Sequence, residues 1–222
     1  MLWARHDLCR LILFYLKKKR TPTVVFGEWA ECGRDEGMAK GHQQAVDYML
    51  DMVINNQNPF SFLDAGCGNG WVVRQVAKHP KCVSAGGVDG AQQMIDKAKT
   101  YDSKNHYTCA DLDSWKPNYL VDIVHSMEVV YYLKDPFAFL QNVYNSWLAK
   151  EGVLILGLDF YEENMVSHSW PEDCGISTMR LFSEKHWIEL FRKAGFKKVK
   201  STRFGVKENW SGTLILKGLK RK

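Results

Sequence analysis

The sequence lacks the features of several protein classes. No two of its six cysteines form a CxxC pair, and no group of His and Cys has the spacing of zinc ligands. No apolar run approaches the roughly 20 residues of a membrane-spanning helix, and no segment repeats. These absences argue against a zinc module, a helical membrane span and a repeat architecture. Scattered cysteines are typical of thiols that stay reduced, so we expect an intracellular protein.

The central part of the chain is short of basic residues. Residues 21–191 hold thirteen Lys and Arg against twenty-three Asp and Glu, although the net charge of the whole chain is +5. The positive charge comes from the ends, because residues 1–20 carry six Lys and Arg with one acid, and residues 192–222 carry eleven with one acid. Solvated basic tails explain this pattern, and so does a patch for RNA or an anionic membrane.

The first twenty residues combine an apolar helical pattern with the basic run KKKR. Their longest apolar run, residues 11–16, is short for a signal peptide, and no small-residue cleavage site follows it. We expect a helix packed on the domain in a cytoplasmic protein. The alternatives are an interfacial membrane helix or a mitochondrial presequence, which would make the protein mitochondrial.

From residue 41 onward, strand patterns alternate with helix patterns. Apolar helix faces are predicted over residues 45–53, 72–77, 91–98, 137–147 and 187–191. Strands are predicted over 61–66, 82–89, 106–111, 121–127, 152–160, 197–204 and 212–218. Such alternation predicts an α/β fold, a Rossmann-like sheet of seven mostly parallel strands with helices on both faces. The last two strands have no helix between them, so one strand near an edge should be antiparallel.

A glycine-rich loop follows the first predicted strand, in the stretch FLDAGCGNG at residues 62–70. Glycines at every second position let the backbone approach a ligand closely. Asp89 and Asp111 then end the second and third strands, on the edge of the sheet where such folds bind ligands. A dinucleotide enzyme prefers the spacing GxGxxG, and an anion site gains nothing from Asp64 before the glycines. A ligand with positively charged groups would gain from that acid.

These segments resemble the class I S-adenosylmethionine-dependent methyltransferases, and most closely the small type-11 group. DAGCGNG is similar to the glycine motif of that family, GVDGAQQMIDKAK to its ribose segment and CADLDSWKP to its adenine segment. VDIVHSMEVVYYLKDP and LFSEKHWIELFRKAGFKKVK resemble its fourth strand and its late helix with the sixth strand. The resemblance covers about residues 60–216. It implies a methyltransferase domain at residues 59–222, with residues 1–58 forming a helical segment that covers the cofactor site.

The resemblance also implies the residues that bind S-adenosyl-L-methionine. The amino-acid part of the cofactor should lie near the glycine loop and the fourth strand, the ribose at Asp89, and the adenine near Met94, Asp111 and Leu112. The full set that it implies is Asp64, Gly66, Cys67, Gly68, Asp89, Gly90, Met94, Asp111, Leu112, Ser126 and Met127. Two positions depart from the family pattern. Gly90 replaces a larger residue that often covers adenine, and His125 stands where an apolar residue is usual.

Methyl transfer needs little from the protein beyond positioning, unless the acceptor must lose a proton. Our catalytic candidates are Glu128, Tyr132 and His168, with Tyr131 and Asp159 as further options. We predict that residues 26–42 and 159–177 form long irregular lids over the site. Their candidate lid residues are Trp29, His42, Tyr161, His168 and Trp170.

The acidic centre and the aromatic lids favour a small-molecule acceptor that is methylated on O, N or S. Methylation of RNA or protein with the help of the basic ends remains an alternative, as does a non-catalytic subunit that only binds the cofactor. No metal is expected. Nucleic acid is a less favoured partner, and the sequence does not indicate the oligomeric state.

Overall fold

The computed structural model describes residues 19–54 and 58–221. The helix expected over residues 1–20 therefore lies almost wholly outside the described residues. Within the described part of the chain, no helix has the length and apolarity needed to cross a membrane.

The core of the molecule is a seven-stranded sheet with the order β3-β2-β1-β4-β5-β7-β6. The strands are β1 (Phe60–Ala65), β2 (Cys82–Asp89), β3 (His106–Cys109), β4 (Val121–Met127), β5 (Leu148–Leu158), β6 (Lys197–Phe204) and β7 (Thr213–Leu219). β7 lies between β5 and β6 and is antiparallel to both. The short connection from β6 to β7 cannot form a parallel crossover. The predicted fold, mostly parallel with one reversed strand near an edge, is confirmed.

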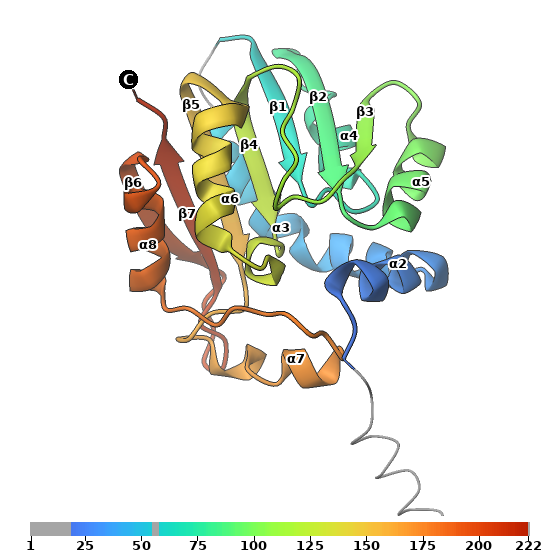
Figure 1. Cartoon of the computed structure of the whole chain (residues 1–222), viewed down its shortest axis with the longest axis vertical. Helices are drawn as coiled ribbons and strands as arrows, with labels where there is room; N and C mark the ends of the chain where they lie inside the picture. The colour runs from blue at the N-terminus through green and yellow to red at the C-terminus, as the bar shows by residue number, and fades with distance from the viewer. Residues whose placement is uncertain (1–18, 55–57, 222) are drawn as a thin grey trace, which may run out of the picture.

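Helices cover both faces of the sheet. They are α2 (Pro22–Cys32), α3 (Arg34–Ile54), α4 (Trp71–Val76), α5 (Gln92–Tyr101), α6 (Pro136–Asn142), α7 (Trp170–Asp173) and α8 (Glu184–Lys193). α6 and α8 lie in front of the sheet in Figure 1, and α3 and α4 lie behind it. Short 3₁₀ turns follow β4 (Val130–Tyr132) and β5 (Met165–Ser167), and α6 runs on into a π-helical turn, Val143–Trp147.

Successive residues of β1 face opposite layers of the core. Leu63 packs in the layer beneath α6 and α8, together with Phe139 and Trp187. Phe62 packs in the layer beneath α3, α4 and α5. Because side chains alternate along a strand, Asp64 lies on the same face as Phe62, at the carboxyl end of the strand. The cover over that end comes from α3.

The segment 26–42, which we predicted to be an irregular lid, is helical. Pro22 begins α2 in the first turn, where a missing amide N–H costs nothing. Gly33 ends α2 with a φ of 78°, and α3 then starts at Arg34. The glycines that suggested a loop, Gly37 and Gly41, lie within α3, and no atom lies within 4 Å of an added Cβ, so no close contact requires glycine there. In Figure 1 the arrowheads of β1, β2 and β4 point toward α2 and α3, which close this edge of the sheet.

One pair of substitutions tests the glycine loop. Gly66 has a φ of +77°, and an added Cβ would lie 2.2 Å from Cγ2 of Val129. We expect Gly66→Ala to lower the free energy of unfolding by roughly 2–4 kcal/mol, from backbone strain and overpacking. Gly37→Ala is the matched control, and it should raise that free energy by about 0.5–1 kcal/mol. Denaturant unfolding followed by circular dichroism measures both, and a Gly66→Ala variant as stable as the wild type would contradict the expected clash.

Candidate active site

The glycine loop between β1 and α4 is a backbone cradle. Gly66, Gly68 and Gly70 all have positive φ, at 77°, 52° and 77°. An added Cβ on Gly66 or Gly70 would strike Val129 or Tyr107, whereas one on Gly68 would meet only the sulfur of Met94, at 3.9 Å. The loop therefore packs tightly on two sides and leaves Gly68 open toward a ligand.

Asp35 of α3 fastens this loop from above, a role that the sequence did not indicate. Its buried carboxylate accepts a hydrogen bond from the side-chain amide of Asn69 at 2.6 Å. Lys97 of α5 forms an ion pair with the same carboxylate at 2.8 Å. A buried carboxylate needs such partners. These contacts therefore hold α3 and the glycine loop together.

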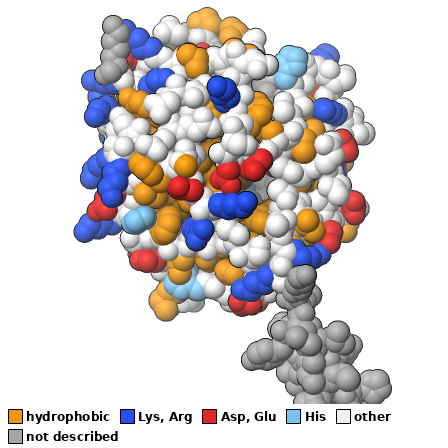
Figure 2. All heavy atoms as spheres, viewed as in Figure 1, with side chains coloured by type: hydrophobic (Ala, Val, Ile, Leu, Met, Phe, Trp, Pro, Cys, Tyr) orange, Lys and Arg blue, Asp and Glu red, His pale blue; other side chains and the backbone are white. Residues whose placement is uncertain are grey.

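A cavity of about 460 Å³ opens beside the loop, between the carboxyl ends of the strands and the helices α2 and α3. Figure 2 shows a hollow near the centre of this face with acidic side chains at its rim. All but one of the predicted cofactor residues line the cavity, namely Asp64, Gly66, Cys67, Gly68, Asp89, Gly90, Met94, Asp111, Leu112 and Met127. The exception is Ser126, which is buried and donates its hydroxyl to the carbonyl of Ala65 at 2.7 Å. The volume of the cavity is typical of a site for a compact organic ligand.

Asp89 joins the loop to the second strand. Its Oδ2 accepts from the Gly68 amide at 2.9 Å, and its Oδ1 accepts from the Ala91 amide at 2.8 Å. Burial raises the pKa of this carboxyl, and the two backbone donors oppose that shift. A carboxylate oxygen has two lone pairs, so Asp89 keeps acceptor capacity for a sugar hydroxyl.

Gly90 explains why α2 can lie so close. An added Cβ at Gly90 would come within 2.7 Å of the Thr23 methyl group. Thr23, Pro22 and Phe26 all line the cavity. The larger residue that often follows this acid in the family is thus replaced in space by the start of α2.

His125 points toward the first strand. It lies directly opposite Asp64 in the parallel register of β1 and β4, and its Nδ1 is 2.7 Å from Asp64 Oδ1. Its side chain is fully buried and also lines the cavity. The predicted cofactor acid is therefore paired before any ligand arrives.

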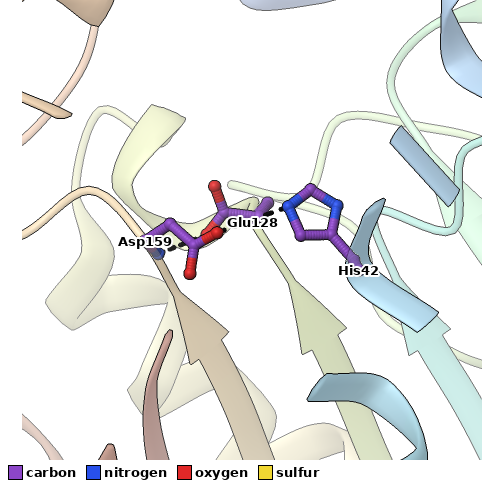
Figure 3. A group of neighbouring side chains, drawn as sticks. All are labelled: His42, Glu128 and Asp159. Atoms are coloured by element: carbon purple, nitrogen blue, oxygen red, sulfur yellow. Dashed lines mark hydrogen bonds and ion pairs between the residues drawn. The ribbon is translucent and has the colours of Figure 1, made fainter. Parts of the chain in front are cut away.

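Near the ends of β4 and β5, three polar side chains from three elements converge. They are His42 of α3, Glu128 after β4 and Asp159 after β5, and we call them the acceptor cluster (Figure 3). His42 and Glu128 line the cavity. Nε2 of His42 lies 3.4 Å from Oδ2 of Asp159. From the sequence, Glu128 and Asp159 were catalytic candidates and His42 was only a candidate lid residue. The structure brings all three together.

Glu128 is held in an unusual conformation. Its φ is 59°, rare for a residue with a side chain, and such strain often accompanies function. One carboxylate oxygen accepts from the Asp159 amide, and the other accepts from the Tyr131 hydroxyl at 2.6 Å. Burial and the neighbouring Asp159 raise the pKa of Glu128 to about 8. Burial would lower the pKa of His42, but the carboxylates of Asp159 and Glu128 outweigh it and raise that pKa above its usual value.

The ligand atoms of the acceptor cluster lie within 4.8 Å of one another, and His with two carboxylates is a donor set that divalent cations use. However, both Glu128 oxygens already accept protein hydrogen bonds, and His42 pairs directly with Asp159. We therefore treat the cluster as a hydrogen-bonding and proton-accepting group.

The two tyrosines after β4 lie side by side, with ring centroids 4.4 Å apart and the Tyr131 hydroxyl 3.4 Å from that of Tyr132. Tyr131 is fully buried beneath Glu128. Tyr132 lines the cavity, and its ring meets that of Phe26 edge to face, with centroids 5.1 Å apart. Burial raises the pKa of the Tyr132 hydroxyl, which keeps it neutral.

The structure does not bring His168 to the cavity. The side-chain amide of Asn164 bonds the Asp159 carbonyl at 2.7 Å, and the 3₁₀ turn after it carries His168 outward. His168 is exposed, and its Nε2 lies 3.0 Å from the Glu162 carbonyl. Of the other predicted lid residues, Tyr161 is buried against the carbonyls of Ser211 and Gly212, and Trp170 stacks on Trp210. Trp29 packs beside Phe26.

A pH series tests the environment of Glu128. Its folded pKa of about 8 exceeds its ordinary 4.5, so the stability that the neutral form provides is complete below pH 4.5 and is lost as pH rises through 8. Glu128→Gln cannot ionise. Its melting temperature relative to the wild type should therefore rise between pH 5 and pH 9, by at least about 2–4 °C, the shift that 1 kcal/mol produces in a protein of this size.

The matched control for that series is Glu151→Gln. Glu151 also has a positive φ, of 63°, but it is exposed. The difference in melting temperature between Glu151→Gln and the wild type should not change with pH, as measured by differential scanning fluorimetry. A flat difference for Glu128→Gln as well would show that Glu128 is not held in the buried, repulsive site described above.

Solved structures and curated proteins resemble this chain to different extents. The methyltransferase solved in complex with the Trm112 methyltransferase activator of Haloferax volcanii superposes with a TM-score of 0.78 at 26% identity, covering 91% of this chain and 99% of that one. The N-methyltransferase NodS of Bradyrhizobium japonicum WM9, solved with S-adenosyl-L-homocysteine, shares the fold with a TM-score of 0.65 at 16% identity, covering 81% and 87%.

Among curated proteins, the ubiquinone biosynthesis O-methyltransferase of Rickettsia canadensis (strain McKiel) is 27% identical over 105 residues. That of Coxiella burnetii (strain RSA 493 / Nine Mile phase I) is 33% identical over 85 residues. The matched part spans 44% and 36% of these relatives, less than half of their length. A family model described as a methyltransferase domain matches residues 2–201, nearly the whole chain. With the glycine cradle and the acids at the strand ends, this match shows that the chain belongs to the methyltransferase-domain family.

Proposed function

We propose that this methyltransferase acts on a small-molecule acceptor whose reacting atom lies at the acceptor cluster. The observation that carries the proposal is the position of Glu128 and His42 in the wall of the same cavity that the cofactor residues line. The cavity is roofed by α2 and α3, and its volume suits a cofactor with a compact second ligand. A folded macromolecule would need a more open site.

S-adenosylmethionine, when bound, would supply an electrophilic methyl group for the acceptor, with S-adenosylhomocysteine as the leaving group in line. The residues of the chain have two tasks. Asp64, Asp89 and the glycine loop hold the cofactor end of the cavity. Glu128 and His42 orient the acceptor and take up the proton that an O–H, N–H or S–H acceptor releases. With its pKa near 8, Glu128 exchanges a proton close to neutral pH. Tyr132 and Phe26 form an apolar wall.

A second candidate function is methylation of RNA or protein with a partner. The Haloferax volcanii relative was solved with an activator protein, and basic residues gather along the β6 side of the molecule (Figure 2). Those residues, among them Lys197, Lys198 and Lys200, are exposed. However, β6 is three strands away from β4 in the sheet, about 14 Å at the usual strand spacing. The basic edge is therefore set apart from the cavity.

A screen with labelled S-adenosylmethionine separates the two. The protein is incubated with fractions of small metabolites, tRNA and protein, and each fraction is assayed for label. We expect label in the small-metabolite fraction and none with Asp89→Ala, which should lose roughly 2–4 kcal/mol of cofactor affinity. Label confined to tRNA or protein would overturn the proposal.

The acceptor found in that screen then tests the cluster. His42→Ala should lower kcat about 100-fold, at the lower end of what a general base contributes, and leave cofactor affinity within about threefold. His168→Ala is the matched control, and its kcat should stay within about twofold because His168 lies outside the cavity. Equal effects of the two substitutions would remove His42 from the reaction.

A further inference from the structure

A buried carboxylate with one oxygen unpartnered in the described part of the chain, that of Asp159, lies beside the cavity residues His42 and Glu128. Asp159 is 5% exposed and Glu128 is 7% exposed, and Oδ1 of Asp159 has no hydrogen-bond partner among residues 19–54 and 58–221. The one Lys or Arg that lines the cavity in this part of the chain is Lys134, which interacts with Asp113. His42 is thus the sole cationic candidate beside two carboxylates.

This imbalance selects among acceptors. An ionised carboxylate has no donor of its own, so a buried one requires N–H or O–H groups from a ligand. An alcohol or phenol offers one such hydrogen, and an amine or ammonium offers two or three. A carboxylate or phosphate offers none when ionised, and the two buried acids repel it. An amine fits the excess of acceptors best.

The apolar wall points in the same direction. The rings of Phe26 and Tyr132, which line the cavity, meet edge to face, with centroids 5.1 Å apart. Aromatic faces attract alkylammonium ions. The product of N-methylation is such an ion once it holds a proton, so carboxylates and aromatic rings together suit both substrate and product.

We propose that the acceptor is a primary or secondary amine, bound by Asp159 and methylated on nitrogen. This inference rests on the proposed small-molecule function and narrows it. The nitrogen lone pair forms the N–C bond as the C–S bond breaks, and the bonding electrons leave with sulfur as S-adenosylhomocysteine. The extra proton on the methylated nitrogen passes to a carboxylate of the cluster and from there to solvent.

The test uses trideuteromethyl S-adenosylmethionine, the full-length protein and a small-metabolite extract. Tandem mass spectrometry of labelled products identifies the atom that carries the methyl group. An N-methyl product supports the inference. An O-methyl or S-methyl product overturns it and leaves the proposed function intact, whereas label in tRNA or protein alone, or no product at all, overturns both.

A variant pair tests the assigned contact. Asp159→Asn should raise KM for the amine by about 10- to 100-fold, as expected for a lost charge-assisted hydrogen bond, with a smaller change in kcat. Asp173→Asn, at an exposed acid of α7, should change neither.

A second test uses the wild-type protein alone and so does not depend on whether a variant folds. A trimethylammonium analogue of the acceptor should inhibit at least tenfold better than its neutral tert-butyl isostere, and equal inhibition would contradict a cationic site.

A separate observation concerns the other end of the cavity. Nε2 of His125 is buried without a hydrogen-bond partner in the described chain, while its Nδ1 is held by Asp64. The amides of Gly66 and Cys67 donate to the Val88 carbonyl at 2.7 and 3.1 Å, and the Gly68 amide donates to Asp89. The first three loop amides are therefore already used by the protein.

The geometry points to His125 as the residue that binds the α-carboxylate of the cofactor. The amino-acid end of S-adenosylmethionine carries an ammonium and a carboxylate on one carbon. Asp64 and His125 place a carboxylate and a ring nitrogen without a partner in the described chain side by side on neighbouring strands, complementary to that pair. Nε2 of His125 can donate to the ligand carboxylate while Nδ1 stays on Asp64.

Calorimetry with three ligands tests this assignment. S-adenosylhomocysteine has the whole amino-acid end, its decarboxylated analogue lacks the carboxylate, and 5′-methylthioadenosine lacks the entire group. His125→Gln should weaken S-adenosylhomocysteine by about 10- to 100-fold, the range for a hydrogen bond to a charged group, and leave the other two unchanged. The control Asp111→Asn, at the adenine end, should weaken all three alike.

Three outcomes would overturn the role of His125. One is an equal loss of all three ligands in His125→Gln, which would mark a purely structural residue. Another needs only the wild type, and it is equal affinity for S-adenosylhomocysteine and its decarboxylated analogue. The third is strong discrimination that survives in His125→Gln, which would instead assign the carboxylate to the free amides at the start of α4.

Discussion

Carboxylates buried at the ends of parallel strands need partners, and the site is organised by how each one finds them. Asp64 at the end of β1 pairs with His125, and Asp89 at the end of β2 is held by two backbone amides. Glu128 after β4 takes a backbone amide and a tyrosine hydroxyl. Asp159 after β5 has His42 on one oxygen and no partner on the other. Within the described residues, protein groups satisfy the acids after β1 and β2 but leave one Asp159 oxygen without a partner, which the proposed substrate would supply.

The sequence predicted the parts of this arrangement that depend on local pattern. Strand and helix periodicity predicted the seven strands. The lack of a helix before the last strand predicted that one strand near an edge is antiparallel, and β7 is that strand. Asp135 and Ser183 are helix caps, as expected from their positions before Pro136 and Glu184. The acids Asp64, Asp89 and Asp111 could be placed because parallel strands bring their carboxyl ends to one edge.

The failures share a physical cause, since each concerns a contact between elements far apart in the chain. Gly37 and Gly41 suggested a loop because glycine lowers helix propensity, but packing of α3 across the strand ends outweighs that cost. His168 and His42 both lie in glycine-bearing aromatic segments, and no local pattern separates the one that reaches the cavity. Only the turn after β5, which the Asn164–Asp159 hydrogen bond fixes, decides that His168 faces solvent. The orientation of His125 follows from strand register, which a single strand does not reveal.

The helix α3 links the two ends of the site. Asp35 holds the glycine loop through Asn69, and His42 meets Asp159 in the acceptor cluster. Seven residues, or about two turns, separate Asp35 from His42, so both face the same way and lie about 10 Å apart along the axis. One rigid element therefore sets the distance between the glycine loop, which we expect to hold the cofactor, and the cluster that we propose for the acceptor. Because in-line methyl transfer depends on that distance, a substitution that shifts α3 along its axis would disturb turnover even where it touches neither ligand.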